Sequence, residues 1–363
     1  MNVFEQMIER GHERVAFHHD EETGLRAIIA VHSTTLGNAL GGTRRWYYET
    51  EGDALYDVLR LAKGMTLKSA VAGLPMGGAK SVILKNAPDQ PPTEAEARAM
   101  GRFVDTFHGT YIAAEDVGVN TRFCDWMALE TKYIMGGETV SRGGDPSPYT
   151  AAGIVRGMKA ALAHRGKPIE FDTLIVAIQG VGSVGYYVAK ILTEHGARIV
   201  AADINEANLD RIKTLGPHVE IVDPEAILTT ECDILAPCAL GAVINGKNIP
   251  QLQCDIVCGG ANNILEDPDE DAVLLKNAGI LYAPDFVVNS GGLIQLAGLY
   301  LGMTQDQLDV NHEAIEQTTL HILKESESNS STYAAAVAVA HQRIAEGRRQ
   351  AVDSASSTEA QGV

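Results

Sequence analysis

Apolar residues recur along the first part of the chain with two different periods. Segments 25–31, 81–84 and 111–114 are short runs of branched or small apolar residues, which predict buried strands. In segments 53–63 and 93–108 the apolar residues recur at helical spacing, which predicts helices. Strands that alternate with helices indicate an α/β layer.

A second pattern follows segment 143–148, in which two glycines and two prolines interrupt both helix and strand. An apolar-faced helix is expected at 150–164. A buried strand at 173–179 then leads into a glycine-rich loop and a further helix. This order is typical of a βαβ unit.

The length of 363 residues is sufficient for two domains, each with its own core. We predict an α/β fold with an N-terminal catalytic domain at 1–144 and a Rossmann dinucleotide-binding domain at 145–330, with a cleft between them. Segment 331–363 contains a helical run, and we expect it to pack back on the first domain.

Composition narrows the class of protein. A net charge of −18 without a basic stripe argues against nucleic acid and anionic membrane surfaces as partners. The five cysteines have no Cys-x-x-Cys spacing and no nearby histidine cluster, which indicates neither a disulfide framework nor a metal site. Because the chain also has no apparent signal segment and no apolar run of transmembrane length, we expect a cytoplasmic protein.

The loop after strand 173–179 reads Gly180-Val181-Gly182-Ser183-Val184-Gly185, the Gly-x-Gly-x-x-Gly pattern in its required context. The first glycine allows a tight turn, the second allows approach to a pyrophosphate, and the third allows close packing of helix on strand. Asp203 ends the next strand, where a carboxylate accepts from ribose hydroxyls and repels a ribose phosphate. We therefore expect NAD rather than NADP. The alternative role for Asp203 or Asn205 is capping of a helix at 206–214.

Lys80 lies in a glycine-rich run beside an apolar strand, a setting that favours an amine with a lowered pKa. Lys68 lies just beyond the predicted helix 53–63, and Asp116 follows strand 111–114. Two lysines and an aspartate would make a substrate clamp with an acid/base pair. The alternative is that both lysines are ordinary solvated surface residues.

Several blocks, in order, resemble the amino acid dehydrogenases of the glutamate, leucine, phenylalanine and valine group, most of all the leucine-specific members. The matching blocks are Thr34 to Arg44, Met65-Thr66-Leu67-Lys68, Gly77-Gly78-Ala79-Lys80, Glu115-Asp116-Val117-Gly118, Gly260-Ala261-Asn262-Asn263 and Tyr282 to Gly292. The resemblance implies reversible oxidative deamination of an L-amino acid to a 2-oxo acid and ammonia, with hydride passing to NAD. It also implies a homo-oligomer, often an octamer.

By this resemblance, Lys68 would bind the substrate carboxylate, Lys80 would act on water, and Asp116 would move protons at the amino group. Thr150 would lie at the nicotinamide carboxamide, and Asn262 between substrate and nicotinamide. The further cofactor-side positions are Ala236, Cys238 and Ala239.

The resemblance also implies a side-chain pocket lined by Leu40, Ala113, Leu293 and Leu296, with Gly41, Gly42 and Met65 as further substrate-binding residues. Glutamate-specific members have a lysine at the position of Leu40, and an apolar group there cannot compensate a distal carboxylate. We therefore predict a branched aliphatic substrate, namely leucine, with valine and isoleucine. The alternatives are a phenylalanine or valine dehydrogenase on the same scaffold, or a catalytically silent NAD-binding protein.

Overall fold

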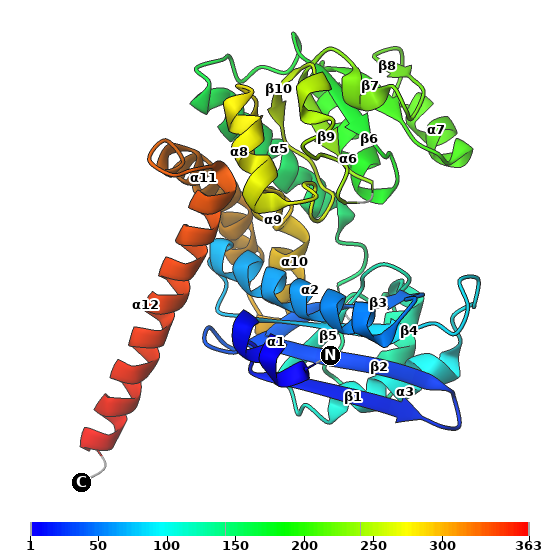
Figure 1. Ribbon diagram of the computed structural model, residues 1–363, viewed down its shortest axis with the longest axis vertical. Coiled ribbons are helices and arrows are strands. Elements are labelled where there is room, and N and C mark those ends of the chain that lie inside the picture. Colours follow the sequence, from blue (N-terminus) through cyan, green and yellow to red (C-terminus); the bar gives the residue numbers. More distant parts are fainter. Residues whose placement is uncertain (1, 142, 240, 362–363) are drawn as a thin grey trace. The chain divides into compact units, whose positions relative to one another are not determined.

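The computed structural model describes residues 2–141, 143–239 and 241–361, with side chains up to residue 350. Its contacts divide the chain into two compact units, and Figure 1 labels most of their elements. Unit 1 comprises Met1–Asp145, Gln295–Met303 and Ala340–Val363, and unit 2 comprises Pro146–Ile294 and Thr304–Val339. Segment Gln295–Met303 thus groups with unit 1, whereas the sequence assigned all of 145–330 to the second domain. The α/β fold class is confirmed.

Unit 1 is built on a mixed five-stranded sheet in the order β1-β2-β4-β3-β5. Strands β3, β4 and β5 are parallel to one another, while β1 and β2 are antiparallel to their neighbours. The elements are α1 (Val3–Arg10), β1 (Arg14–Asp20), β2 (Leu25–Ser33), β3 (Ala39–Trp46), α2 (Glu51–Val71), β4 (Gly77–Leu84), α3 (Glu94–Asp105), β5 (Tyr111–Ala114) and α4 (Thr121–Ala128).

The two faces of this sheet are covered by different helices. On one face, Ile28, Ala30 and Val82 pack against apolar residues of α2. On the other, residues such as Ala79 and Tyr111 pack with α3 and α4. Because successive side chains of a strand point to opposite faces, this division fixes which functional side chains can meet.

Helix α2 is longer than the sequence pattern indicated, and it therefore contains Lys68. It begins at a capping box in which Thr50 accepts from the Asp53 backbone and Asp53 accepts from the Thr50 backbone. Gly64, the first residue beyond the predicted end, has open space where a side chain would lie. The helix continues because Leu67, Ala70 and Val71 beyond it are buried.

Unit 2 contains a parallel six-stranded sheet in the order β11-β10-β9-β6-β7-β8. This is the open parallel sheet expected of a Rossmann domain, in which consecutive strands are joined through helices or short turns. Its elements are α5 (Ser147–His164), β6 (Ile175–Gln179), α6 (Ser183–Glu194), β7 (Arg198–Ala202), α7 (Glu206–Lys213), β8 (Val219–Ile221), η1 (Ile227–Thr229), β9 (Cys232–Pro237), η2 (Ile249–Gln251), β10 (Cys254–Val257), α8 (Pro268–Asn277), β11 (Leu281–Tyr282), α9 (Asp285–Val288) and α11 (Gln305–Glu325).

Two helices are shared by the units: α10 (Gly291–Leu301) and α12 (Thr332–Gln361). In the part of α12 that belongs to unit 1, the Arg343 guanidinium donates to the Ala70 and Val71 carbonyls at the end of α2. Among the described residues, none of the helices is long and apolar enough to cross a membrane.

Candidate functional site

Glycines in β3 and β4 allow backbone and side chains of unit 1 to approach unusually closely. A Cβ atom at Gly42 would lie 3.1 Å from Lys80 Nζ and 2.8 Å from Asp116 Cβ. A Cβ at Gly78 would lie 2.0 Å from the Thr66 backbone nitrogen of α2. Any larger residue at either position would displace the site, so these glycines are required by packing.

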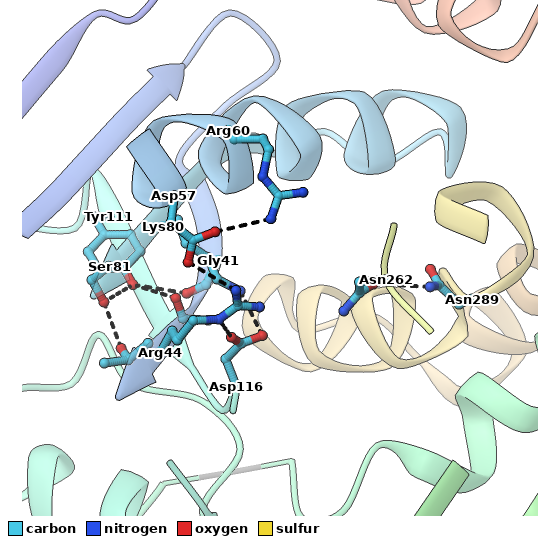
Figure 2. A network of polar contacts seen from close by, with 12 residues as sticks. Gly41, Arg44, Asp57, Arg60, Lys80, Ser81, Tyr111, Asp116, Asn262 and Asn289 are labelled. Atoms are coloured by element: carbon cyan, nitrogen blue, oxygen red, sulfur yellow. Dashed lines mark hydrogen bonds and ion pairs between the residues drawn. The ribbon is translucent and has the colours of Figure 1, made fainter. Parts of the chain in front are cut away.

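Lys80 and Asp116 form a buried ion pair at the centre of this arrangement (Figure 2). Lys80 Nζ lies 2.8 Å from Asp116 Oδ1, and the two side chains are 6% and 10% exposed. Lys80 comes from β4, and Asp116 lies two residues beyond the end of β5. The structure thus brings together two of the three charged residues that the sequence singled out.

Burial and the neighbouring charges set the protonation of this pair. Burial lowers the pKa of Lys80, and the Arg44 charge lowers it further, although Asp116 acts in the opposite direction. For Asp116, burial would raise the pKa, but Lys80 and Arg44 together outweigh it and hold the pKa below its usual range. Asp116 is therefore a carboxylate at neutral pH, beside an amine that releases its proton more readily than a free lysine.

Arg44 is a part of the site that the sequence reasoning missed. Its Nε lies 2.8 Å from Asp116 Oδ2, and one of its terminal nitrogens lies 3.0 Å from Asp57 Oδ2 of α2. Asp57 also accepts hydrogen bonds from Tyr48 and Arg60. The available signal was strand alternation, because Arg44 is two residues beyond Gly42 on β3 and shares its face.

Lys68 and Met65 are partly buried residues of α2. Lys68 follows Asp57 by eleven residues, which is about three helical turns, so both lie on the same side of the helix. Lys68 thus lies on the same face of α2 as Asp57, the residue that pairs with Arg44.

The expected pocket residues of unit 1 do not all lie on one side of the sheet. Leu40 alternates with Gly42 and so shares the face of Lys80, with only 1% of its surface exposed. Ala113 instead lies on the opposite face, where its methyl group packs in the core with Tyr111 and residues of α3 and α4. We therefore correct its assignment to the pocket, since the period-two alternation of β5 turns the Ala113 side chain away from Lys80. Leu296 of α10 lies close to Gly143.

Polar residues on that second face support the backbone at Gly41. The Tyr111 hydroxyl donates to the Gly41 carbonyl at 3.0 Å and lies 2.9 Å from the Ser81 hydroxyl (Figure 2). The Ser81 hydroxyl also lies 2.8 Å from that of Thr43. These groups are buried. They hold in place the strand segment that carries the two adjacent glycines.

Glu115, next to Asp116, is a further titratable group that the sequence reasoning did not use. Burial raises its pKa to about 7, with repulsion from Asp145 and Glu138 as further causes. It is partly buried. A carboxyl group with a pKa near neutrality thus directly precedes Asp116 in the chain.

In unit 2 the glycine-rich loop has the geometry that its pattern requires. Gly180 has a φ of 85°, and a Cβ there would lie 2.5 Å from Ala239 Cβ. A Cβ at Gly185 would lie 2.0 Å from the Gly180 carbonyl oxygen, which shows the close packing of α6 on this loop. At Gly182, which precedes α6, a Cβ would meet only the Asn208 side chain, at 3.9 Å. This leaves space at a helix N-terminus, where an anion binds well.

Asp203 follows β7 and is hydrogen-bonded to the glycine-rich loop. Its carboxylate accepts from the backbone nitrogens of Val181 and Asn205, both at 2.8 Å. Asn205, and not Asp203, is the N-cap of α7. Of the two capping alternatives, only Asn205 therefore holds that role.

The remaining predicted cofactor-side positions, and the predicted pocket residue Leu293, lie in several helices, strands and loops of unit 2. Thr150 is in the first turn of α5, where its hydroxyl donates to the Pro146 carbonyl. Cys238, after β9, has a pKa raised to about 12 by burial, so it is a thiol and not a reactive thiolate. Val181, Ser183 and Val184 form the loop and first turn around Gly182, and Ala236 is buried in β9. Leu293 is buried in the first turn of α10.

Asn262 is held by a second asparagine that the sequence reasoning did not single out. Asn289 is 3% exposed, and its Nδ2 donates to Asn262 Oδ1 at 3.1 Å and to the Gly260 carbonyl at 3.2 Å (Figure 2). Because Asn262 Oδ1 accepts this bond, the orientation of the Asn262 amide is fixed. Within the described residues, no group of three His, Cys, Asp or Glu side chains could hold a metal ion.

Comparison with family models decides the class of this protein. Residues 12–133 match the Glu/Leu/Phe/Val dehydrogenase dimerisation domain, and residues 145–207 and 202–358 match the Glutamate/Leucine/Phenylalanine/Valine dehydrogenase model. The chain belongs to the Glu/Leu/Phe/Val dehydrogenase family. The resemblance predicted from the motifs is confirmed, and the protein is an oxidoreductase of a nicotinamide-dependent family.

Individual relatives match this family member over nearly their whole length. The leucine dehydrogenase of Bacillus cereus is 42% identical over 348 residues, which cover 95% of this chain and 94% of the relative. The valine dehydrogenase of Streptomyces virginiae is 41% identical over 342 residues, with coverage of 93% and 95%. The crystal structure of L-tryptophan dehydrogenase from Nostoc punctiforme aligns with a TM-score of 0.80 at 37% identity, covering 95% of this chain and 99% of that one.

Proposed function

We propose that this protein catalyses the NAD-dependent, reversible oxidative deamination of a branched aliphatic L-amino acid, namely leucine, with valine and isoleucine as further substrates. The products are the 2-oxo acid and ammonia. The buried Lys80–Asp116 pair is the single observation that carries this proposal. It places a carboxylate beside an amine of lowered pKa, as proton transfer during deamination requires.

Each charged residue of unit 1 has a role that suits its chemistry. Lys68, a cation on α2, would bind the substrate carboxylate. Lys80, in its neutral form, would take a proton from the water that attacks the substrate carbon. Asp116, held ionised by two cations, would accept a proton from the substrate amino group and return it to the departing ammonia.

The residues of unit 2 fit a dinucleotide. The open space at Gly182 before α6 suits a pyrophosphate, and Asp203 stands at the end of β7, where the adenosine ribose is recognised. NAD when bound supplies the hydride acceptor. NAD is favoured over NADP because the Asp203 carboxylate would repel a ribose phosphate.

The substrate class follows from Leu40, which shares the face of Lys80. A distal carboxylate placed against this side chain would lose its hydration without gaining a cation, so glutamate should be excluded. Leucine and valine dehydrogenases among the relatives support an aliphatic substrate. The tryptophan dehydrogenase keeps an aromatic substrate, and hence the phenylalanine alternative, open to test.

The test is NAD reduction with leucine, valine, isoleucine, phenylalanine and glutamate at equal, saturating NAD. We expect the highest kcat/KM for leucine, values within about a hundredfold for valine and isoleucine, and no turnover of glutamate. A higher kcat/KM for phenylalanine than for leucine would show that the substrate is aromatic and would favour the phenylalanine dehydrogenase alternative. The absence of turnover with every amino acid would favour the catalytically silent alternative.

We further propose a homo-oligomer in a reducing, cytoplasmic environment. The match of residues 12–133 to a model described as a dimerisation domain supports the first part. All five cysteines are free thiols, which supports the second. Size-exclusion chromatography with light scattering would measure the subunit number, for which the family resemblance suggests an octamer.

A further inference from the structure

We propose that Arg44 is a positioning residue for the Asp116 carboxylate and that Asp57 holds Arg44 in place. The inference rests on the function proposed above, because it concerns how the Lys80–Asp116 pair is made competent. In that proposal Arg44 enters only as one of the two cations that keep Asp116 ionised, and Asp57 has no role. Both belong to unit 1, as does the pair itself.

The two oxygens of the Asp116 carboxylate are bound by two different cations. Lys80 Nζ lies 2.8 Å from Oδ1, and Arg44 Nε lies 2.8 Å from Oδ2 (Figure 2). With one oxygen bound on each side, the carboxylate cannot rotate without breaking an ion pair in a site that is nine-tenths buried. Arg44 thereby directs Oδ1 toward Lys80.

Arg44 is itself held in place by Asp57. One of its terminal nitrogens lies 3.0 Å from Asp57 Oδ2, and the same oxygen accepts from the Tyr48 hydroxyl at 2.8 Å. Arg60 lies 3.0 Å from the other oxygen, Oδ1. A planar guanidinium can join two separate carboxylates in this way, whereas the single ammonium of a lysine cannot reproduce both contacts.

Arg44 and Asp57 also influence the protonation of Lys80. The Arg44 charge favours ionised Asp116 and disfavours protonated Lys80, while Asp57 favours protonated Lys80. The charged and titratable groups that face this cluster are Lys80, Asp116, Asp57, Arg60 and Tyr48, with Glu115 adjacent in the chain. Loss of Arg44 and loss of Asp57 should therefore shift the titration of Lys80 in opposite directions.

The Arg44–Asp57 ion pair also links two elements of unit 1. Asp57 and Lys68 share one side of α2, so the Arg44–Asp57 ion pair connects the helix that would hold the substrate carboxylate to the strand end that carries Asp116. A change at Asp57 should accordingly affect KM for the amino acid as well as kcat. A change at Arg44 should act mainly on kcat.

The experiment compares Arg44→Gln, Arg44→Lys and Asp57→Asn with the matched control Arg60→Gln. Arg60 is an arginine that contacts Asp57 but neither Asp116 nor Lys80. The readout is the pH profile of kcat/KM for leucine, whose acid limb reports the group that must lose a proton. Each profile is repeated with Glu115→Gln added, because Glu115 also titrates near neutral pH.

We expect Arg44→Gln to lower kcat/KM at neutral pH by about tenfold or more and to move the acid limb to higher pH. Asp57→Asn should move it to lower pH and raise KM. Arg44→Lys, which keeps the charge, should lower kcat with little movement of the limb. Arg60→Gln should move the limb less than either Arg44→Gln or Asp57→Asn, because Arg60 contacts Asp57 but neither Asp116 nor Lys80.

Unaltered acid limbs in both Arg44→Gln and Asp57→Asn, with activity reduced only in proportion to the folded fraction, would overturn the inference. If Arg44→Gln does not fold, Arg44→Lys and Asp57→Asn still decide it through kcat, KM and the direction of the limb. An inactive wild-type protein would instead contradict the proposed function, so the two failures are distinguishable.

Discussion

Lys80 Nζ lies 2.8 Å from Asp116 Oδ1, and both side chains are at least nine-tenths buried. Such a pair is costly to bury, and breaking it by removing one partner leaves an uncompensated charge. Its presence beneath Gly42, where no other residue fits, is best explained by function.

Lys80→Ala should lower kcat by roughly a hundred- to ten-thousand-fold, because the group that removes a proton from water is lost. NAD affinity should be largely unaffected, since the glycine-rich loop belongs to unit 2. Steady-state kinetics and a fluorescence titration with NADH measure the two effects. Lys85→Ala is the matched control and should be active. Weak NADH binding by Lys80→Ala would contradict this division of roles.

Lys68→Ala should raise KM for the amino acid by roughly ten- to a hundredfold, because a charge-assisted hydrogen bond to the substrate carboxylate is lost. The matched control is Lys63→Ala, on the same helix but a different side. Initial rates over a range of leucine concentrations provide the comparison. An unchanged KM in the Lys68 variant would remove Lys68 from the substrate site.

Asp203→Ser should narrow the preference for NAD over NADP, because the carboxylate that repels a ribose phosphate is removed. The ratio of kcat/KM for the two cofactors is the measurement. Asp203 also accepts from the Val181 and Asn205 backbones, so a modest fall in Tm is expected. A lower Tm with an unchanged ratio would mean that Asp203 serves only the structure of the loop.

Glu115→Gln should change how stability depends on pH. Burial raises the pKa of Glu115 to about 7 in the folded protein, above its usual 4.5, so the folded state binds the extra proton between these values and stability falls as pH rises through them. Because glutamine does not titrate, the variant lacks this decrease in stability. Its Tm relative to wild type should therefore increase from pH 5 to pH 8. A constant difference in Tm would show that Glu115 titrates normally.

Leu40→Ala should move substrate preference toward larger side chains, because Leu40 shares the face of Lys80. The ratio of kcat/KM for phenylalanine and leucine measures this. A stability loss of about 2–5 kcal/mol is expected for a buried leucine, so the Tm of the variant must be checked. A folded variant with an unchanged ratio would show that Leu40 does not line the pocket.

The parts of the fold that could be predicted from sequence are those fixed by local rules. Strand Tyr111–Ala114 and the left-handed turn at Gly180 follow from apolar runs and from the glycine requirement of a tight turn. The end of α2 could not be predicted, because burial of Leu67 and Val71 by the tertiary structure outweighs the low helix propensity of Gly64.

The geometry of the candidate site, too, could be predicted only in part from local sequence patterns. The resemblance named Lys80 and Asp116, but their joint dependence on Arg44 arises from the pairing of β3 with β4 and β5, which no local pattern contains. Ala113 was assigned to the pocket by position in a motif, whereas the register of β5 turns its side chain to the other face. Side-chain direction depends on register, and register is set by tertiary structure.

The central claim is that this protein interconverts an amino acid and a 2-oxo acid with ammonia, and NADH oxidation tests it most directly in the aminating direction. The protein is mixed with NADH and the 2-oxo acid of leucine, with and without ammonium. The account predicts rapid NADH oxidation only when both are present, with one leucine formed for each NADH consumed. NADH oxidation without ammonium, or none under either condition, would contradict it.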